Sequence, residues 1–466
     1  MRRPFGLVLG LFLLLEAVGK AGAQPADEER RVEEKARETL EPTEVAILKE
    51  GGRLVFDYGF WVNYLFSDFK NDDNNGTVKD TTNATHALDP RFWIRAVLRP
   101  SPEGPSRNEH SLYLRVKDKL TWRDPGDSNG TFDDNGPHVD YLFLSLDFNP
   151  VGVLLGRRLY GVGQGLAYSN VHDGAELQLA FPTGSIAGLL SRILPHEDNL
   201  DESVPGGKKS GRTFYGVEGK WLGIPNHGLY GYVLFQRDDG EERPEDAAQD
   251  YDYDSNYFGV GSEGKLWGNL RYAAEGILET GRSFSPTLNL KKDVLAWAMD
   301  VALTYDVQLP TQPTLYAEYA FGSGDADRTD VTDTISGNAF GRDTNFLYFG
   351  YLPTGYALSP RLSNLRMFKV GMAVKPLERI RFFKEITVSV DLYWFKKDEP
   401  KGGIFDTNAT QNSRDVGSEI DLTLTWPILS DLSLAVEYGH FKPGDAYPTS
   451  ANDSARYFSV GATSAF

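Results

Sequence analysis

Cationic side chains gather in three short segments of the first half of the chain, at every fourth position in the first, two positions apart in the second and adjacent in the third. The set is Arg91, Arg95, Arg99, Arg115, Lys117, Arg157 and Arg158, and Arg271 adds a cation in the second half. The planar guanidinium group of arginine binds a carboxylate or a phosphate through two parallel hydrogen bonds. If these side chains share one surface, they form a site for an anionic group.

Acidic side chains occupy the inward alternate positions of predicted strands in the second half of the chain. The set is Glu275, Asp300, Glu318, Asp391, Glu419, Asp421 and Glu437. On neighbouring strands about 4.8 Å apart, the cations would form one wall and the acids a wall opposite. The field between the walls would favour polar, charged or sugar-like solutes over apolar ones. The alternative is mutual neutralisation by salt bridges.

The segments that carry these residues alternate between apolar and polar residues with a period of two. In residues 385–395 the apolar face consists of Ile386, Val388, Val390, Leu392 and Trp394. The polar face of the same segment carries Asp391. This pattern is typical of a strand with one face in lipid and the other in water.

Applied to the whole chain, the same pattern predicts 18 strands, an even number as in bacterial single-chain barrels. They lie near 53–66, 89–99, 110–123, 138–148, 150–159, 173–181, 184–193, 212–221, 227–237, 252–264, 268–281, 293–306, 313–322, 364–374, 384–397, 415–426, 431–442 and 455–466. The predicted fold class is therefore all-β, a transmembrane antiparallel barrel that closes by pairing 53–66 with 455–466.

The predicted connections alternate between short turns and long polar loops, as barrels with periplasmic turns and outer loops require. The loop at 323–363 is unusually long, and loops of such length are commonly functional. It contains the apolar run 346–351, which would be a liability if exposed. We expect this loop to fold into the barrel mouth as a constriction or lid; the alternative is docking onto neighbouring loops.

The N-terminal region predicts export. Two arginines, an apolar run from Phe5 to Leu15 and the small residues 21–23 have the order of a signal peptide, which we assign to 1–23. Residues 24–52 form a charged periplasmic leader, helical or disordered, and 53–466 form the barrel. The terminal Phe466 lies on an alternating strand and resembles the insertion signal of outer-membrane barrels.

Composition limits the alternatives. The chain has no cysteine, which excludes disulfides and thiolate metal sites, and its net charge of −18 argues against nucleic-acid binding. The acidic stretches 72–76 and 127–133 do not fit the full calcium-loop pattern, and we interpret them as solvated turns. We expect contact with membrane lipid and lipopolysaccharide, and the leader is a candidate site for a periplasmic partner.

One motif points to a family. Residues 156–165 read GRRLYGVGQG and are followed by DGAEL at 173–177. The chain here resembles the alginate export family of outer-membrane porins, which has a Gly-Arg dipeptide, a Gly-rich loop and an Asp-Gly opening the next strand. The resemblance implies an 18-stranded barrel whose arginine-lined lumen passes an acidic polysaccharide such as alginate.

Catalysis is the competing class of function. A barrel enzyme needs a nucleophile, a base and an orienting acid close together. The seven histidines fall mostly in loops or at strand ends, and the sequence has no Gly-x-Ser-x-Gly or His-Glu-x-x-His motif. We therefore expect a channel for a hydrophilic, anionic solute, with no catalytic residue, metal or cofactor. The alternative is a plugged structural or receptor barrel, or a partner-binding outer-membrane protein.

Overall fold

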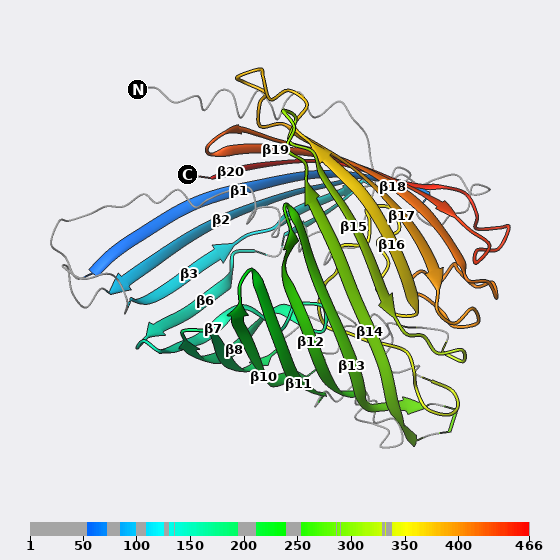
Figure 1. The fold of residues 1–466 in the computed structure, drawn as a ribbon. Coiled ribbons are helices and arrows are strands. Elements are labelled where there is room, and N and C mark those ends of the chain that lie inside the picture. Colours follow the sequence, from blue (N-terminus) through cyan, green and yellow to red (C-terminus); the bar gives the residue numbers. More distant parts are fainter. Residues whose placement is uncertain are drawn as a thin grey trace.

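The computed structural model describes residues 54–71, 84–98, 109–124, 130–134, 136–193, 211–238, 253–285, 287–288, 290–328, 331 and 338–465. They form one antiparallel sheet that closes on itself as a barrel (Figure 1). The predicted signal peptide and leader, Arg99 and Phe466 lie outside the described residues. Within the described ranges, no helix is long and apolar enough to cross a membrane.

The sheet contains 20 hydrogen-bonded segments within the described residues. They are β1 (Leu54–Lys70), β2 (Ala84–Leu98), β3 (His110–Lys117), β4 (Leu120–Asp124), β5 (Thr131–Asp134), β6 (His138–Asp147), β7 (Val151–Gly161), β8 (Ser169–Phe181), β9 (Gly184–Arg192), β10 (Arg212–Ile224), β11 (His227–Asp238), β12 (Asp254–Trp267), β13 (Leu270–Ser285), β14 (Leu290–Asp306), β15 (Thr314–Gly322), β16 (Leu365–Val374), β17 (Thr387–Lys397), β18 (Asp415–Leu429), β19 (Leu432–Pro443) and β20 (Ala455–Ala465).

Two pairs of segments are halves of one strand. β3 and β4 lie end to end along β2, and β5 and β6 lie end to end along that composite strand. The described residues therefore form 18 spanning strands, which confirms the predicted fold. The break between β3 and β4 lies opposite Pro90, which has no N–H to donate to a neighbouring strand.

Closure is made by the first and last strands. β1 and β20 pair antiparallel from Trp61 opposite Ala465 to Lys70 opposite Arg456, as the sequence analysis predicts. Most predicted boundaries differ by a few residues; for example, β1 extends to Lys70 and not 66, and β2 begins at Ala84 and not 89. β17 begins at Thr387, not 384, because the preceding residues form tight turns in which the Ile386 N–H donates to the Phe383 carbonyl at 3.0 Å.

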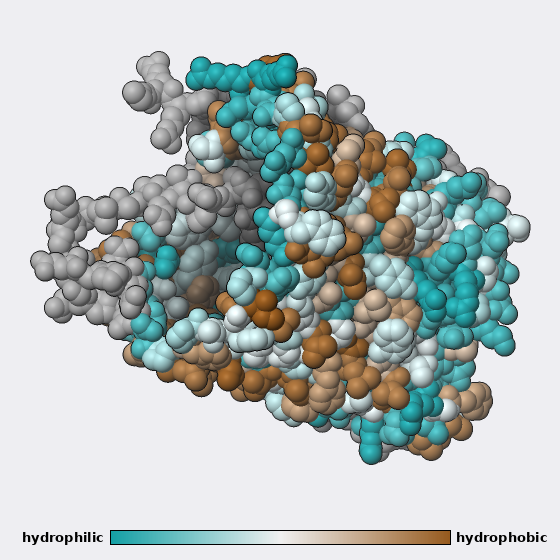
Figure 2. Space-filling view, viewed as in Figure 1, coloured by the Kyte–Doolittle hydropathy of each residue, from teal (hydrophilic) through white to brown (hydrophobic). Residues whose placement is uncertain are grey.

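The two faces of each strand have opposite character. On β14, Ala296 and Ala298 are buried on the inner face, whereas Leu295 and Trp297 are exposed on the outer face. Figure 2 shows the outer residues as a hydrophobic band over the barrel, next to hydrophilic atoms at the end where the long loops lie. The band has the chemistry required of a surface in contact with lipid.

The lipid-facing assignment predicts an asymmetric response to charge. Leu278 lies near the middle of β13 and is 43% exposed on the outer face, whereas Leu309 lies in the short β14–β15 turn and is 57% exposed. Leu278→Arg should lower the free energy of unfolding by about 2–4 kcal/mol, and Leu309→Arg by about 0–1 kcal/mol. Equilibrium unfolding in urea of the two variants in lipid vesicles measures the difference. Equal losses would contradict the assignment of the faces.

Candidate functional site

The first part of the site is the cationic side, which we define as the inner face of β2, β3 and β4. Arg91 lies opposite Lys117 in the β2–β3 pairing. Arg91 donates to Asp89 at 2.9 and 2.5 Å, and Arg115 donates to Asp140 at 2.8 and 3.0 Å. Both arginines are buried. Their charges are neutralised by salt bridges to the two aspartates, which is the alternative considered in the sequence analysis.

Aromatic rings fix the same two guanidinium groups. The Arg115 guanidinium carbon lies 4.0 Å from the centroid of the Tyr141 ring and 5.1 Å from that of Trp61, and the Arg91 carbon lies 5.7 Å from Trp61. A cation over a ring face is attracted by the ring quadrupole. Arg91 and Arg115 are thus held in place on the inner surface, each by aromatic rings and by a carboxylate partner.

Arg95 is the more accessible cation of this side. Its side chain is 38% exposed, and its guanidinium lies 4.0 Å from the Glu109 carboxylate. Asp57 faces it across the β1–β2 pairing. Lys117 is buried on the adjacent strand. Arg95 therefore has the most accessible side chain among the predicted cations of this side, Arg91, Arg95, Arg115 and Lys117.

The register decides which of Arg157 and Arg158 faces inward. Arg157 lies opposite Leu142 on β6, which is exposed on the outer face, and pairs with Asp173 at 2.8 and 2.9 Å. Arg158 lies opposite the buried His172 and reaches Glu176 at 3.5 Å. The register therefore places Arg158 on the inner face, whereas Arg157, which was predicted to line the lumen, lies on the outer face.

The second part of the site is the acidic side, which we define as the inner face of β13 to β19. The register places Glu275 opposite Asp300 and Asp391 opposite Asp421. Glu437 lies opposite Thr423 on β18 and accepts a hydrogen bond from Ser459 at 3.0 Å. The predicted acids thus lie on neighbouring strands.

Lys369 lies within the acidic side and was missed by the sequence analysis. It lies opposite Glu318 in the β15–β16 pairing, at 3.7 Å, and 4.0 Å from Asp391. The signal that could have found it is its parity. Lys369 lies two residues after the buried Met367 on the predicted strand 364–374, so both side chains point to the inner face.

Acidic side chains hold the Gly-rich loop between β7 and β8 inside the barrel. Glu218 on β10 accepts a hydrogen bond from the Gly163 N–H at 3.1 Å, and Glu275 accepts one from the Gln164 N–H at 2.7 Å. Gly163 has φ of +58°, and a Cβ there would lie 2.6 Å from a Glu275 oxygen. The position therefore requires glycine for both backbone angle and space.

Glu279 holds the aromatic part of the loop between β15 and β16. It accepts a hydrogen bond from the Leu347 N–H at 2.9 Å and another from the Tyr253 hydroxyl at 2.7 Å. Phe346 and Phe349 are completely buried. The aromatic part of the loop therefore lies inside the barrel. The residues that flank it also contact the β17–β18 loop, where the Gly403 N–H donates to the Arg328 carbonyl at 2.9 Å.

The two inward loops bind each other through their backbones. Tyr168 and Phe349 form a parallel bridge, and the Phe349 N–H donates to the Ala167 carbonyl at 2.9 Å. A Cβ on Gly350 would collide with the Gly165 carbonyl oxygen, so this approach requires glycine. The pair of loops, residues 162–168 and 346–358, is named the inner plug below.

Glu419 on β18 fixes the far end of the inner plug. Its carboxylate accepts hydrogen bonds from the N–H groups of Tyr356, Ala357 and Leu358 at 2.7, 2.6 and 2.9 Å. Carboxylates that bind backbone N–H groups form strong charge-assisted hydrogen bonds. Glu275 and Glu419, which were predicted as channel lining, therefore also act as anchors for loops, and so does Glu279.

The loops beyond the strands are joined by buried polar contacts. The Tyr447 hydroxyl, between β19 and β20, donates to Asp406, between β17 and β18, at 2.7 Å. Burial raises the pKa of Asp406, and it raises the pKa of Tyr447 well above its ordinary value. These shifts have a structural cause and do not indicate catalysis.

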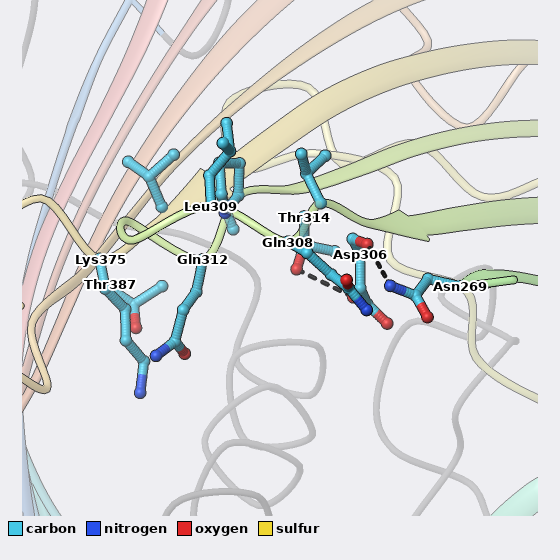
Figure 3. A pocket seen from close by; sticks show the side chains of 12 residues that line it. Asn269, Asp306, Gln308, Leu309, Gln312, Thr314, Lys375 and Thr387 are labelled. Atoms are coloured by element: carbon cyan, nitrogen blue, oxygen red, sulfur yellow. Dashed lines mark hydrogen bonds between the residues drawn. The ribbon is translucent and has the colours of Figure 1, made fainter.

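Arg271 lies at the opposite end of the barrel, by the short turns. It donates to Asp306 at 2.9 and 3.1 Å, and both side chains are about half exposed. Asp306 also borders a pocket of about 420 Å³ between the β14–β15 and β16–β17 turns, where its carboxylate accepts a hydrogen bond from Thr314 (Figure 3). Arg271 lies on β13, which pairs with β12 and β14 and not with the strands of the cationic side.

Comparison with known proteins gives one family and a set of similar folds. A family model described as alginate export matches residues 192–460, more than half of the chain. Acinetobacter baumannii OccAB1 is 10% identical with a TM-score of 0.56, covering 91% of this chain and 98% of that chain. Pseudomonas aeruginosa OccK5 (OpdH) is 9% identical with a TM-score of 0.54, covering 88% and 98%. At these identities the likeness concerns the fold alone. No curated protein matches the chain.

The packing of the inner plug predicts a change in conductance. Gly350→Ala should push residues 346–358 away from Gly165, because the added methyl group overlaps its carbonyl oxygen. We expect a larger single-channel conductance in planar bilayers. Gly276→Ala is the matched control, because a Cβ at this position on β13 meets no atom within 4 Å. Equal conductance of the two variants would contradict a role of the inner plug in limiting the pore.

Proposed function

The chain belongs to the alginate export family, and from that premise we propose that it passes a hydrophilic, anionic solute, such as an acidic polysaccharide, across the bacterial outer membrane. The barrel and the family support the channel. The observation that carries the choice of an anion is the cationic side, where Arg91 and Lys117 are register partners and Arg95 is the accessible member. Arginine is well suited to carboxylate and phosphate groups.

The acidic side does not contradict an anionic solute. Glu275, Glu279 and Glu419 each accept backbone N–H groups of the inner plug. Glu318 and Asp391 lie near the Lys369 ammonium group. Much of the negative charge is thus directed at loop backbone and at a lysine, which reduces its repulsion of a solute on the opposite side.

Transport would proceed by exchange of water for weak protein contacts. A solute anion would leave its hydration shell, contact the Arg95 guanidinium and then move to a neighbouring cation. Conduction requires binding that is favourable enough for entry and weak enough for release. The counter-ions Asp89 and Asp140 meet this need, because they weaken the attraction of Arg91 and Arg115 for the solute.

A plugged receptor barrel is the second candidate, and the inner plug favours it. Phe346 and Phe349 are completely buried, and Phe349 bridges to Tyr168 inside the barrel. A barrel closed in this way would bind a ligand without conducting. Absence of single-channel currents in both the unaltered protein and Gly350→Ala would favour this function.

Replacing Arg95 tests the selectivity. Arg95→Glu should shift the reversal potential in a salt gradient toward cations, because the variant places a carboxylate where the solute passes. The anion preference of the unaltered protein should weaken from 0.1 to 1 M salt, as the Debye length falls from about 10 Å to about 3 Å.

The control is Arg381→Glu, which makes the same charge change at an exposed residue of the β16–β17 turn. Its reversal potential should stay near that of the unaltered protein. If Arg95→Glu behaves like Arg381→Glu, the cationic side does not select the solute and the proposal fails.

A further inference from the structure

The connection between β16 and β17, residues 375–386, is named the basic turn. It lies on the side of the short connections, which is periplasmic in barrels of this kind, and it extends beyond the strand ends at the top of Figure 1. The Ile380 N–H donates to the Leu377 carbonyl at 2.9 Å, and the Phe383 N–H donates to the Ile380 carbonyl at 2.8 Å. These successive tight turns give the segment a defined shape.

Aromatic side chains hold the basic turn against the outer face of the barrel. Trp426 on β18 has the same parity as Leu422, which is 42% exposed on the outer face. The centroids of the Phe382 and Phe383 rings each lie 5.2 Å from that of the Trp426 ring. Ile380 and Phe382 remain about half exposed. The basic turn therefore continues the apolar band to its periplasmic edge, where aromatic side chains mark the boundary between membrane and water.

The two acids of the basic turn have partners within the protein. The Glu385 carboxylate lies 2.6 Å from the Lys375 ammonium group and 3.3 Å from that of Lys384. Both lysines lower the pKa of Glu385. Glu378 accepts a hydrogen bond from the Gln312 amide group at 3.3 Å. The acids are thus directed at neighbouring protein groups, and the arginines of the basic turn carry its excess positive charge.

Those arginines are Arg379 and Arg381. Both side chains are exposed, and neither has an ion pair or a side-chain hydrogen bond with the rest of the described chain. The other short connections that the structure describes contain no arginine or lysine; they are residues 148–150, 182–183, 225–226, 268–269, 307–313 and 430–431. Among the described connections, positive charge on this side of the barrel is therefore gathered in one place, beside exposed apolar side chains.

We propose that the basic turn binds an anionic phospholipid of the periplasmic leaflet. Arg379 and Arg381 would bind the headgroup phosphate, because guanidinium groups bind phosphate oxygens through parallel hydrogen bonds. Ile380 and Phe382 would contact the acyl chains next to it. Cations combined with aromatic and aliphatic side chains are typical of segments that lie in the membrane interface. A free phosphate ion would leave the apolar side chains uncovered, so a lipid fits the surface better.

A lipid bound at this point would fix the depth of the barrel in the membrane beside β16, β17 and β18. Each cation close to an anionic membrane surface strengthens binding about fivefold. The basic turn packs on the outer face, and this inference therefore goes beyond the proposed channel function and does not depend on which solute passes.

Native mass spectrometry of the full-length protein in detergent micelles tests the proposal. The protein is mixed with equal amounts of dimyristoylphosphatidylglycerol and dimyristoylphosphatidylcholine, which have the same acyl chains and differ in net headgroup charge. The unaltered protein should bind phosphatidylglycerol preferentially. Arg379→Gln combined with Arg381→Gln should lower this preference at least about fivefold.

The control is Arg342→Gln combined with Lys401→Gln. It removes the same charge from exposed residues of the β15–β16 and β17–β18 loops and should keep the preference of the unaltered protein. Equal preference in the two double variants overturns the proposal. Both should keep the single-channel conductance of the unaltered protein, which shows that they fold.

An excess of glycerol 3-phosphate separates a lipid site from a site for free phosphate. Phosphatidylglycerol should stay bound, because the soluble compound has no acyl chains to contact Ile380 and Phe382. Displacement of the lipid by glycerol 3-phosphate overturns the proposal and indicates a site for the phosphate group alone. Neither result affects the Arg95 selectivity test.

Discussion

The constraint on which the rest of the structure depends is that every backbone N–H and C=O group in the membrane needs a partner within the protein. A sheet meets this condition by closing, because an open edge in hydrocarbon would be costly. Here the pairing of β1 with β20 removes the edge. Closure also separates an apolar outer face from an inner face on which charged side chains meet water and each other.

The inner face is then used to hold chain inside the barrel. Glu275, Glu279 and Glu419 project from three positions of the wall and bind N–H groups of loops that have no strand partner. The same need for backbone partners that closes the barrel thus explains where the inner plug is anchored.

On the cationic side, the buried charged residues bind other side chains of the wall and not the backbone of a loop. Arg91 and Arg115 are buried with carboxylate partners and aromatic rings, so they contribute to the packing of the wall. Arg95 keeps much of its surface. A wall that combines paired charges with the more accessible Arg95 guanidinium group is suited to contacts that are made and released repeatedly.

The sequence by itself determined the architecture. Period-two alternation marks each strand and its two faces, because neighbouring side chains must point to opposite sides, and the 18 strands follow from it. It could not separate Arg157 from Arg158, because Gly156 has φ of +119° and only the register against Leu142 and Asp173 fixes the face. The sequence also left open what the inner acids contact. Only the tertiary structure brings Glu279 to Leu347, 68 residues away, since loop paths depend on packing and not on local periodicity.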